Sequence, residues 1–213
     1  MDSGLSKAVS AKKPILIGIA GPSCSGKTLL AKSLSERLKP DNTSILTLDS
    51  YYYDLADLPF DSRKQRNFDI PDALDWNLLE SHIELLAEGN QVEKPVYLFP
   101  SHTRSGKGEL MVPGEYVIIE GLFALNSELI RSFLGMAVYI ALDDTTCLDR
   151  RIERDMAERG RSRESIIDQF ESTVKPMAKK YVYTVKHHAD IIINGADSIE
   201  ESTVKVINTL RTI

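Results

Sequence analysis

The sequence GPSCSGKT, residues 21–28, decides the fold of this chain, because it matches the phosphate-loop pattern G-x-x-x-x-G-K-[ST] at every defined position. The apolar run ILIGIA at 15–20 precedes it and predicts a central parallel strand covered on both faces. The stretch 27–38 follows it and predicts a helix, with leucines one turn apart. A strand before the loop and a helix after it are the context that confirms this motif. The sequence therefore predicts a site for the phosphates of a nucleoside triphosphate.

Each residue type in this loop has a physical task. Gly21 and Gly26 permit backbone angles barred to other residues, and successive N–H groups form an anion nest at the helix N-terminus. Lys27 is predicted to contact the β- and γ-phosphates, and Thr28 to offer its hydroxyl to Mg²⁺. A glycine turn that only caps a helix is the alternative, and the strand, spacing, Lys and Thr together argue against it. The predicted phosphate-binding residues of the loop are Gly21, Ser23, Cys24, Ser25, Gly26, Lys27 and Thr28.

Length and composition narrow the class of protein. At 213 residues the chain fits one domain with a substantial core, and its net charge of −5 argues against general attraction to nucleic acid. No apolar run is long enough to cross a bilayer, and residues 1–13 lack the apolar core of a secretory signal, so we interpret them as a flexible lead-in. Cys24 and Cys147 form neither a disulfide framework nor a metal-ligand spacing. Cys24 is interpreted as a small filler of the loop, with an oxidisable thiol as the alternative. We expect a cytoplasmic protein that binds neither nucleic acid nor membranes.

Alternating strands and helices extend outward from the loop and predict an α/β fold with a central parallel sheet of about five strands. The alternation breaks at 92–113, where two strand-like runs, 92–99 and 109–112, flank the polar segment SHTRSGKG and predict an inserted β-hairpin. Residues 14–213 are therefore expected to form a single domain that carries this insertion. Strands are expected at 15–20, 45–48, 116–119, 137–142 and 190–193, and helices at about 27–38, 72–88, 145–158, 163–181 and 198–210.

Two acidic residues follow predicted strands. Asp49 comes after ILTL and Glu120 after YVII. Ligands of open α/β sheets bind beyond the carboxyl ends of the strands, where one carboxylate can hold Mg²⁺ and another can accept a proton from an attacking hydroxyl. For Asp49 a turn cap before Ser50 is an equal alternative on the residues alone.

Further blocks along the chain carry a family resemblance. They are LDSYYYDL, NFDIPDALDW, PVYLFPSHTR, VIIEGLFAL, LDRRIERDMAERGR, QFESTVKPM and HADIII, in that order. Together they resemble the uridine–cytidine kinase family, within the wider uridine kinase and phosphoribulokinase group, from about Pro14 to Asn194. The resemblance implies a phosphate-loop (P-loop) NTPase fold, a three-layer α/β/α sandwich. It also implies ATP-dependent, Mg²⁺-dependent phosphorylation of the 5′-hydroxyl of uridine or cytidine, a reaction of pyrimidine salvage, and often a tetramer.

Roles for individual residues follow from this resemblance. Asp49 would be the general base, with Lys27 and Arg154 on the transferred phosphate. The metal would lie among Thr28, Asp49 and Glu120. Asp69 would accept hydrogen bonds from both ribose hydroxyls, which disfavours 2′-deoxyribose. The predicted substrate-binding residues are Asp49, Tyr52, Phe68, Asp69, Tyr97, Phe99, His102, Arg151 and Gln169.

An arginine-rich segment spans 150–163 and admits two interpretations. One is a solvated helix face with i,i+4 pairs such as Asp155 with Arg159. The other is a lid, at 157–165, whose arginines close over the triphosphate. The resemblance implies lid and phosphate roles for Arg154, Arg159 and Arg161, whereas Arg150 and Arg163 are interpreted as solvated.

The chain departs from the family pattern at two positions near the expected nucleoside pocket. Ile70 stands where the family usually has His, and Leu98 stands where it usually has Asp after the hairpin tyrosine. These departures leave open a related kinase that acts on another alcohol, such as pantothenate, nicotinamide riboside, a sugar phosphate or glycerate. A nucleotide-dependent switch is a third interpretation, and it would leave the nucleoside-site blocks without a task.

Overall fold

A five-stranded parallel sheet forms the centre of the molecule, which a computed structural model describes over residues 13–212. The lead predicted for residues 1–13 lies, but for Lys13, outside the described residues. The strand order is β2-β7-β1-β8-β9, so the strand before the phosphate loop is the middle one. Its strands are β1 (Ile15–Ala20), β2 (Thr43–Thr47), β7 (Tyr116–Glu120), β8 (Leu134–Ala141) and β9 (Ile191–Asn194). The predicted fold class and strand number are confirmed.

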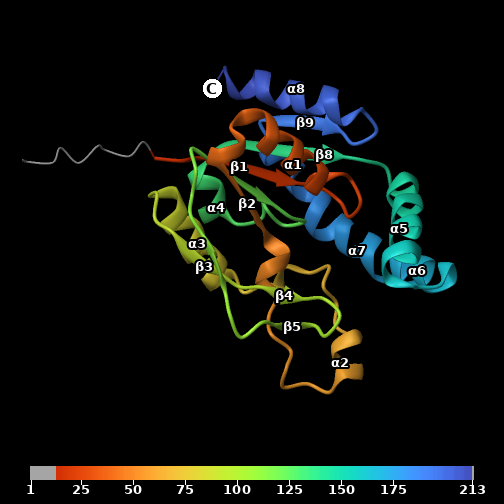
Figure 1. Cartoon of the computed structure of the whole chain (residues 1–213). Coiled ribbons are helices and arrows are strands. Elements are labelled where there is room, and N and C mark those ends of the chain that lie inside the picture. Colours follow the sequence, from red (N-terminus) through yellow and green to blue (C-terminus); the bar gives the residue numbers. More distant parts are fainter. Residues whose placement is uncertain (1–12, 213) are drawn as a thin grey trace, which may run out of the picture.

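Helices cover both faces of this sheet and make a three-layer sandwich (Figure 1). On one face the alternate residues Ile17 and Ile19 of β1 pack with Leu30 and Leu34 of α1 and with Val206 of α8. The other face packs against α3, α4 and the helical run before β9. The covering helices are α1 (Lys27–Leu38), α3 (Trp76–Ala87), α4 (Glu128–Phe133) and α8 (Ile199–Leu210).

Several predicted boundaries are wrong by a few residues. Strand β2 ends at Thr47, and Asp49 lies in a 3₁₀ turn, Leu48–Tyr51. The helix expected from residue 72 begins at Trp76, because Asp75 caps it through a hydrogen bond from the Leu78 N–H. The short helices α2 (Phe60–Lys64) and α4 were missed, since five or six residues give too little periodicity to recognise.

The insertion is the predicted hairpin, and its two arms pair in two short antiparallel ladders, one after the other. Strand β3 (Val92–Lys94) pairs with β6 (Glu109–Met111), and β4 (Tyr97–Leu98) pairs with β5 (Thr103–Arg104). Figure 1 shows β4 and β5 below the sheet, in the same region as α2. Val92, Tyr97 and Met111 of the insertion belong to the same buried core as α3 and α4, and β4 and β5 are strands of only two residues each.

Two further helices stand beyond the strand ends, next to the phosphate loop (Figure 1). Helix α5 (Asp144–Arg159) is capped by Gly160, and a short turn leads to α6 (Arg163–Gln169), which Ser162 caps. The predicted lid at 157–165 is therefore the end of one helix, this turn and the start of the next.

The helical run after α6 departs from the regular helix expected over 163–181. Two π-helical segments, Phe170–Val174 and Ala178–Val182, flank the short α7 (Lys175–Met177), which contains Pro176. Proline has no N–H to donate, so a regular α-helical pattern cannot continue through it. A 3₁₀ segment, Tyr183–His188, then leads to β9. No helix within residues 13–212 is long and apolar enough to span a membrane.

Candidate active site

The phosphate loop connects β1 to α1 in a conformation that requires glycine. Gly26 has a φ of 105° and Gly21 a φ of 150°. A Cβ on Gly21 would also come within 2.5 Å of the Ile140 carbonyl oxygen on the neighbouring strand. Such φ values and so close an approach are open only to glycine, and the loop that they shape can turn backbone N–H groups toward an anion.

Charged and hydroxyl groups gather at the first turn of α1. The Lys27 ammonium is buried and donates to the Pro22 carbonyl oxygen at 2.8 Å, and Thr28 Oγ1 donates to Glu120 Oε1 at 3.3 Å. Burial lowers the pKa of Lys27, and the nearby carboxylates of Glu120 and Asp49 oppose this effect. An ammonium held with few competing partners in a buried loop is well placed to compensate phosphate charge.

Asp49 and Glu120 lie at the ends of neighbouring strands. Thr47, the last residue of β2, pairs with Glu120, the last residue of β7, and Asp49 follows two residues later. Burial raises the pKa of Asp49, while the Lys27 ammonium and the Tyr52 hydroxyl lower it. Burial likewise raises the pKa of Glu120. The two predicted carboxylates therefore meet beside Lys27, as sequence position suggested.

Five aromatic side chains from distant parts of the chain form one cluster. Tyr52 contacts both Phe68 and Tyr97, with ring centroids 5.2 and 5.4 Å apart. Phe68 and His102 are stacked at 5.0 Å, and Tyr97 packs edge-on against Phe99 at 5.3 Å. The structure thus brings together all the aromatic residues predicted for substrate binding, and Phe99 is the exposed end of the cluster.

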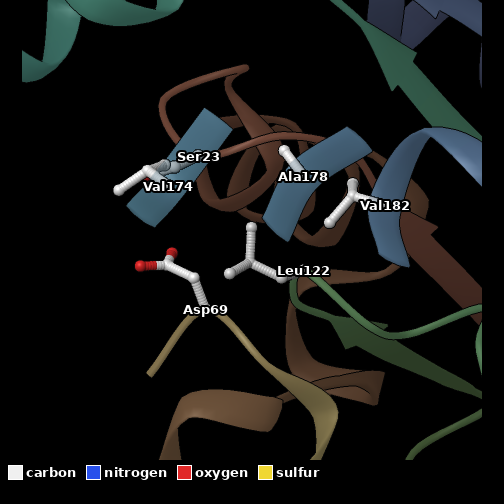
Figure 2. A pocket seen from close by; sticks show the side chains of 6 residues that line it. All are labelled: Ser23, Asp69, Leu122, Val174, Ala178 and Val182. Atoms are coloured by element: carbon white, nitrogen blue, oxygen red, sulfur yellow. The ribbon is translucent and has the colours of Figure 1, made fainter. Parts of the chain in front are cut away.

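Asp69 lies between this cluster and the phosphate loop. Its N–H donates to the Asn67 side chain, which fixes the local turn. Burial raises the pKa of Asp69, and the guanidinium of Arg151 opposes the shift. Figure 2 shows Asp69 and Ser23 of the loop among the side chains that line a small cavity. The cavity, of about 10 Å³, is lined by Ser23, Asp69, Leu122, Val174, Ala178 and Val182.

Arginines from α5 and the following turn face the same region. Arg151 is buried and donates to Ser23 Oγ at 3.2 Å and to Gln169 Oε1 at 3.0 Å. Arg161 also donates to Gln169 Oε1, at 2.5 Å. Arg154, Arg159 and Arg161 surround one carboxylate, that of Asp155. The interpretation of Asp155 as a member of a solvated face is wrong, because its side chain is fully buried.

Arg150 also departs from its expected place on a solvated face. It donates to the carbonyl oxygens of Gly195 at 3.0 Å and Cys24 at 3.4 Å. It lines a hollow of about 280 Å³ beside the phosphate loop, which Asp197 and Ser202 also border. Arg163, by contrast, is exposed as predicted.

Comparisons with known proteins agree with this geometry. The family model of the phosphoribulokinase/uridine kinase family matches residues 16–200. The uridine kinase of Ligilactobacillus salivarius is 41% identical over 181 residues, covering 85% of each chain. The uridine kinase of Lactobacillus johnsonii is 40% identical over 210 residues, covering 96% of this chain and all of the relative.

The chain belongs to the phosphoribulokinase/uridine kinase family. The protein is therefore a kinase that transfers a phosphoryl group to an alcohol. In fold it is similar to phosphoribulokinase from Rhodobacter spheroides, with a TM-score of 0.60 at 18% identity over 87% of this chain and 73% of the other.

Two arginines that sequence reasoning missed hold the segments around the aromatic cluster together. Arg104 of β5 donates to the carbonyl oxygens of Tyr51 and Tyr52, at 3.0 and 2.8 Å, and pairs with Asp75 at 3.1 Å. Arg63 donates to the Ser101 carbonyl oxygen at 3.0 Å. Arg104 is the last residue of the block PVYLFPSHTR. Its partners are backbone oxygens, which every residue has, so the sequence could not indicate which residues it binds.

The two departures from the family pattern lie in different surroundings. Leu98 is 42% exposed, because it alternates with the buried Tyr97 along β4 and points to the opposite side. Ile70 is half-buried, next to Asp69 in the chain. Of the two, Ile70 is therefore better placed to affect the substrate.

Proposed function

We propose that this kinase transfers the γ-phosphate of ATP to the 5′-hydroxyl of uridine or cytidine. The observation that carries the proposal is the position of Asp49. Asp49 interacts with Lys27 of the phosphate loop on one side and with Tyr52 of the aromatic cluster on the other. An acceptor bound against the aromatic rings would thus meet the carboxylate and the triphosphate at one place. The similarity to uridine kinases over most of the chain supports the same substrate class.

On the donor side, the loop N–H groups and Lys27 would bind the β- and γ-phosphates. Arg154, Arg159 and Arg161 would add positive charge where negative charge develops in the transition state. The hollow of about 280 Å³ beside Cys24 and Gly26 is large enough for the base of the donor nucleotide.

Mg²⁺ fits the oxygen groups at this end of the sheet. Thr28 offers a hydroxyl, and Asp49 and Glu120 offer carboxylates. Within residues 13–212 no three His, Cys, Asp or Glu side chains form a metal cluster of their own. That agrees with Mg²⁺, which proteins usually hold through one or two carboxylates together with substrate phosphates and water. When bound, the ion would neutralise phosphate charge.

On the acceptor side, Asp49 would orient the 5′-hydroxyl and accept its proton. Its buried surroundings raise its pKa, which makes the carboxylate a stronger base than an exposed aspartate. Asp69 would accept hydrogen bonds from the two ribose hydroxyls, and Arg151 and Gln169 would support it. The stacked rings of Phe68 and His102 leave no gap for a base between them, so the pyrimidine would lie against the cluster.

A coupled assay of ATP consumption tests the proposal directly. The acceptors are uridine, cytidine, their 2′-deoxy forms, pantothenate, nicotinamide riboside, glycerate and small sugars, with ATP alone as the control. We expect strong stimulation by uridine or cytidine and weak stimulation by the deoxynucleosides. If neither uridine nor cytidine stimulated ATP consumption, the proposal would be wrong. Stimulation by another alcohol would identify that alcohol as the substrate. A cytoplasmic location and a homotetramer belong to the same proposal, and light scattering of the purified protein tests the second.

A further inference from the structure

The lid arginines are Arg154, Arg159 and Arg161. In the described part of the chain, residues 13–212, Asp155 is the only carboxylate that forms ion pairs with them. It lies on the last turns of α5, and its side chain has no exposed surface. A buried carboxylate is costly unless it is paired, so its surroundings explain why it is tolerated there.

Four guanidinium groups meet this one carboxylate. Arg154 makes the shortest contacts, from Nη2 at 2.7 Å and Nε at 2.8 Å, both to Asp155 Oδ1. The guanidinium groups of Arg159, Arg161 and Arg151 lie 3.5, 3.6 and 3.7 Å from its oxygens. Four positive charges surround one carboxylate, and Asp69 and Glu158 nearby offset the excess only in part. The cluster is therefore arranged to receive a further anion.

The turn after α5 closes the cluster around Asp155. Gly160 adopts a left-handed φ of 60°, which lets the chain reverse, and the Arg161 N–H donates to the Asp155 carbonyl oxygen at 3.2 Å. The Arg161 side chain thereby returns over the helix to the Asp155 carboxylate and to Gln169. Backbone and side chain of Asp155 thus hold the same turn.

The cluster adjoins the phosphate loop through Arg151, which donates to Ser23 Oγ. Arg154 uses Nε and Nη2 on Asp155, and within residues 13–212 its Nη1 has no hydrogen-bond partner. Because the guanidinium group is planar, holding Nε and Nη2 also fixes the direction in which Nη1 points.

We propose that Asp155 is a positioning residue that holds the guanidinium of Arg154 in line with the transferred phosphate, and gathers Arg159 and Arg161 beside it. This rests on the proposed function, in which Arg154 contacts the phosphate. Without Asp155 the four positive charges repel one another and the lid arginines turn to solvent. The carboxylate thus preorganises the lid and does not itself touch substrate.

Asp155→Asn tests the idea, since asparagine keeps the shape and one acceptor oxygen but removes the charge. We expect kcat to fall by about 10- to 100-fold, as for loss of one aligned donor group, with KM for the alcohol within about threefold of the parent. Asp149→Asn, an exposed acid on the same helix, is the control and should keep the parental kcat. A kcat within twofold of the parent in a folded Asp155→Asn would overturn the proposal.

A double variant separates positioning from stability. In the Arg154→Ala background, adding Asp155→Asn should lower kcat much less than it does in the parent, because the alignment of Arg154 is already lost and only the placement of Arg159 and Arg161 remains to be disturbed. Losses that multiply would contradict the proposal.

If Asp155→Asn does not fold, Asp155→Glu replaces it. Glutamate keeps the charge but displaces the carboxylate, so kcat should fall several-fold, and unchanged kcat would count against positioning. The assay uses whichever alcohol the acceptor screen identifies, so failure with uridine does not decide this question.

Discussion

The phosphate side and the acceptor side of this site are built in different ways. The phosphate side consists of strand ends of the central sheet and a glycine loop, with ladders of backbone hydrogen bonds behind them. The acceptor side proposed above consists of segments outside the sheet, between residues 52 and 104, with one ladder, β4 with β5, of two residues in each strand. Side-chain bonds from Arg104 and Arg63 to backbone oxygens hold these segments in place.

This difference in construction suggests that the two sides of the site differ in how freely their residues can be substituted. A loop fixed by backbone geometry tolerates few substitutions, whereas exposed side chains on the outer segments, such as Phe99 and Leu98, can be exchanged at small cost to the fold. Catalysis should therefore depend most on the strand-end groups, and substrate choice on the outer segments. The following experiments test that division.

Asp49→Asn should have the largest effect, because Asp49 is the proton acceptor that we propose at the junction of the two sides. We expect kcat to fall by about 10²- to 10⁴-fold, the usual contribution of a general base, with ATP affinity nearly unchanged. Steady-state kinetics and calorimetric titration with ATP measure the two quantities. Asp41→Asn, in the exposed turn before β2, is the matched control. Lost ATP affinity with an unchanged kcat would make Asp49 a metal ligand only.

Asp69→Asn should act on the acceptor alone. It should weaken the proposed hydrogen bonds to the ribose, and it removes one of the two carboxylates, Asp69 and Asp155, that oppose the charge of Arg151. We expect kcat/KM for uridine to fall by about 10- to 100-fold, with less discrimination against 2′-deoxyuridine. Asp72→Asn, exposed in the same block, should behave as the parent. A variant that lost activity while keeping full ribose discrimination would show that Asp69 does not bind the sugar.

Arg104→Gln should loosen the acceptor side without touching the phosphate loop. The variant loses the ion pair with Asp75 and two bonds to backbone oxygens, so the aromatic cluster is held less firmly. We expect KM for the nucleoside to rise by about 3- to 10-fold, with KM for ATP unchanged. Arg66→Gln, at an exposed position, is the control. An equal rise in the KM for the nucleoside and the KM for ATP would contradict the idea that the two sides are held independently.

Tyr52→Phe should have the smallest effect, seen only in the pH dependence. Asp49 must be ionised to act as a base, and the Tyr52 hydroxyl lowers the pKa of Asp49. Removing that hydroxyl raises the pKa further, so activity should be lost at a higher pH as the solution is acidified. Profiles of kcat/KM against pH compare it with Tyr116→Phe, at the other end of β7 from Glu120. If kcat/KM fell at the same pH in the variant as in the parent, the loss of activity at low pH would not be caused by protonation of Asp49.

Sequence alone determined most of the phosphate side. The pattern of residues 21–28, the apolar strand before them and the acids after two further strands depend on local spacing, and parallel strands bring their carboxyl ends to one edge. The family resemblance supplied the aromatic residues, and the structure brings them together.

Only the tertiary structure decided how the outer parts are held. The burial of Asp155 among four arginines depends on how α5, the Gly160 turn and α6 pack, and spacing alone suggested a solvated pair. The bonds of Arg104 to two backbone oxygens depend on where a distant segment passes. Local rules specify a motif that acts through its own backbone, while contacts between distant side chains arise only when the whole chain has folded.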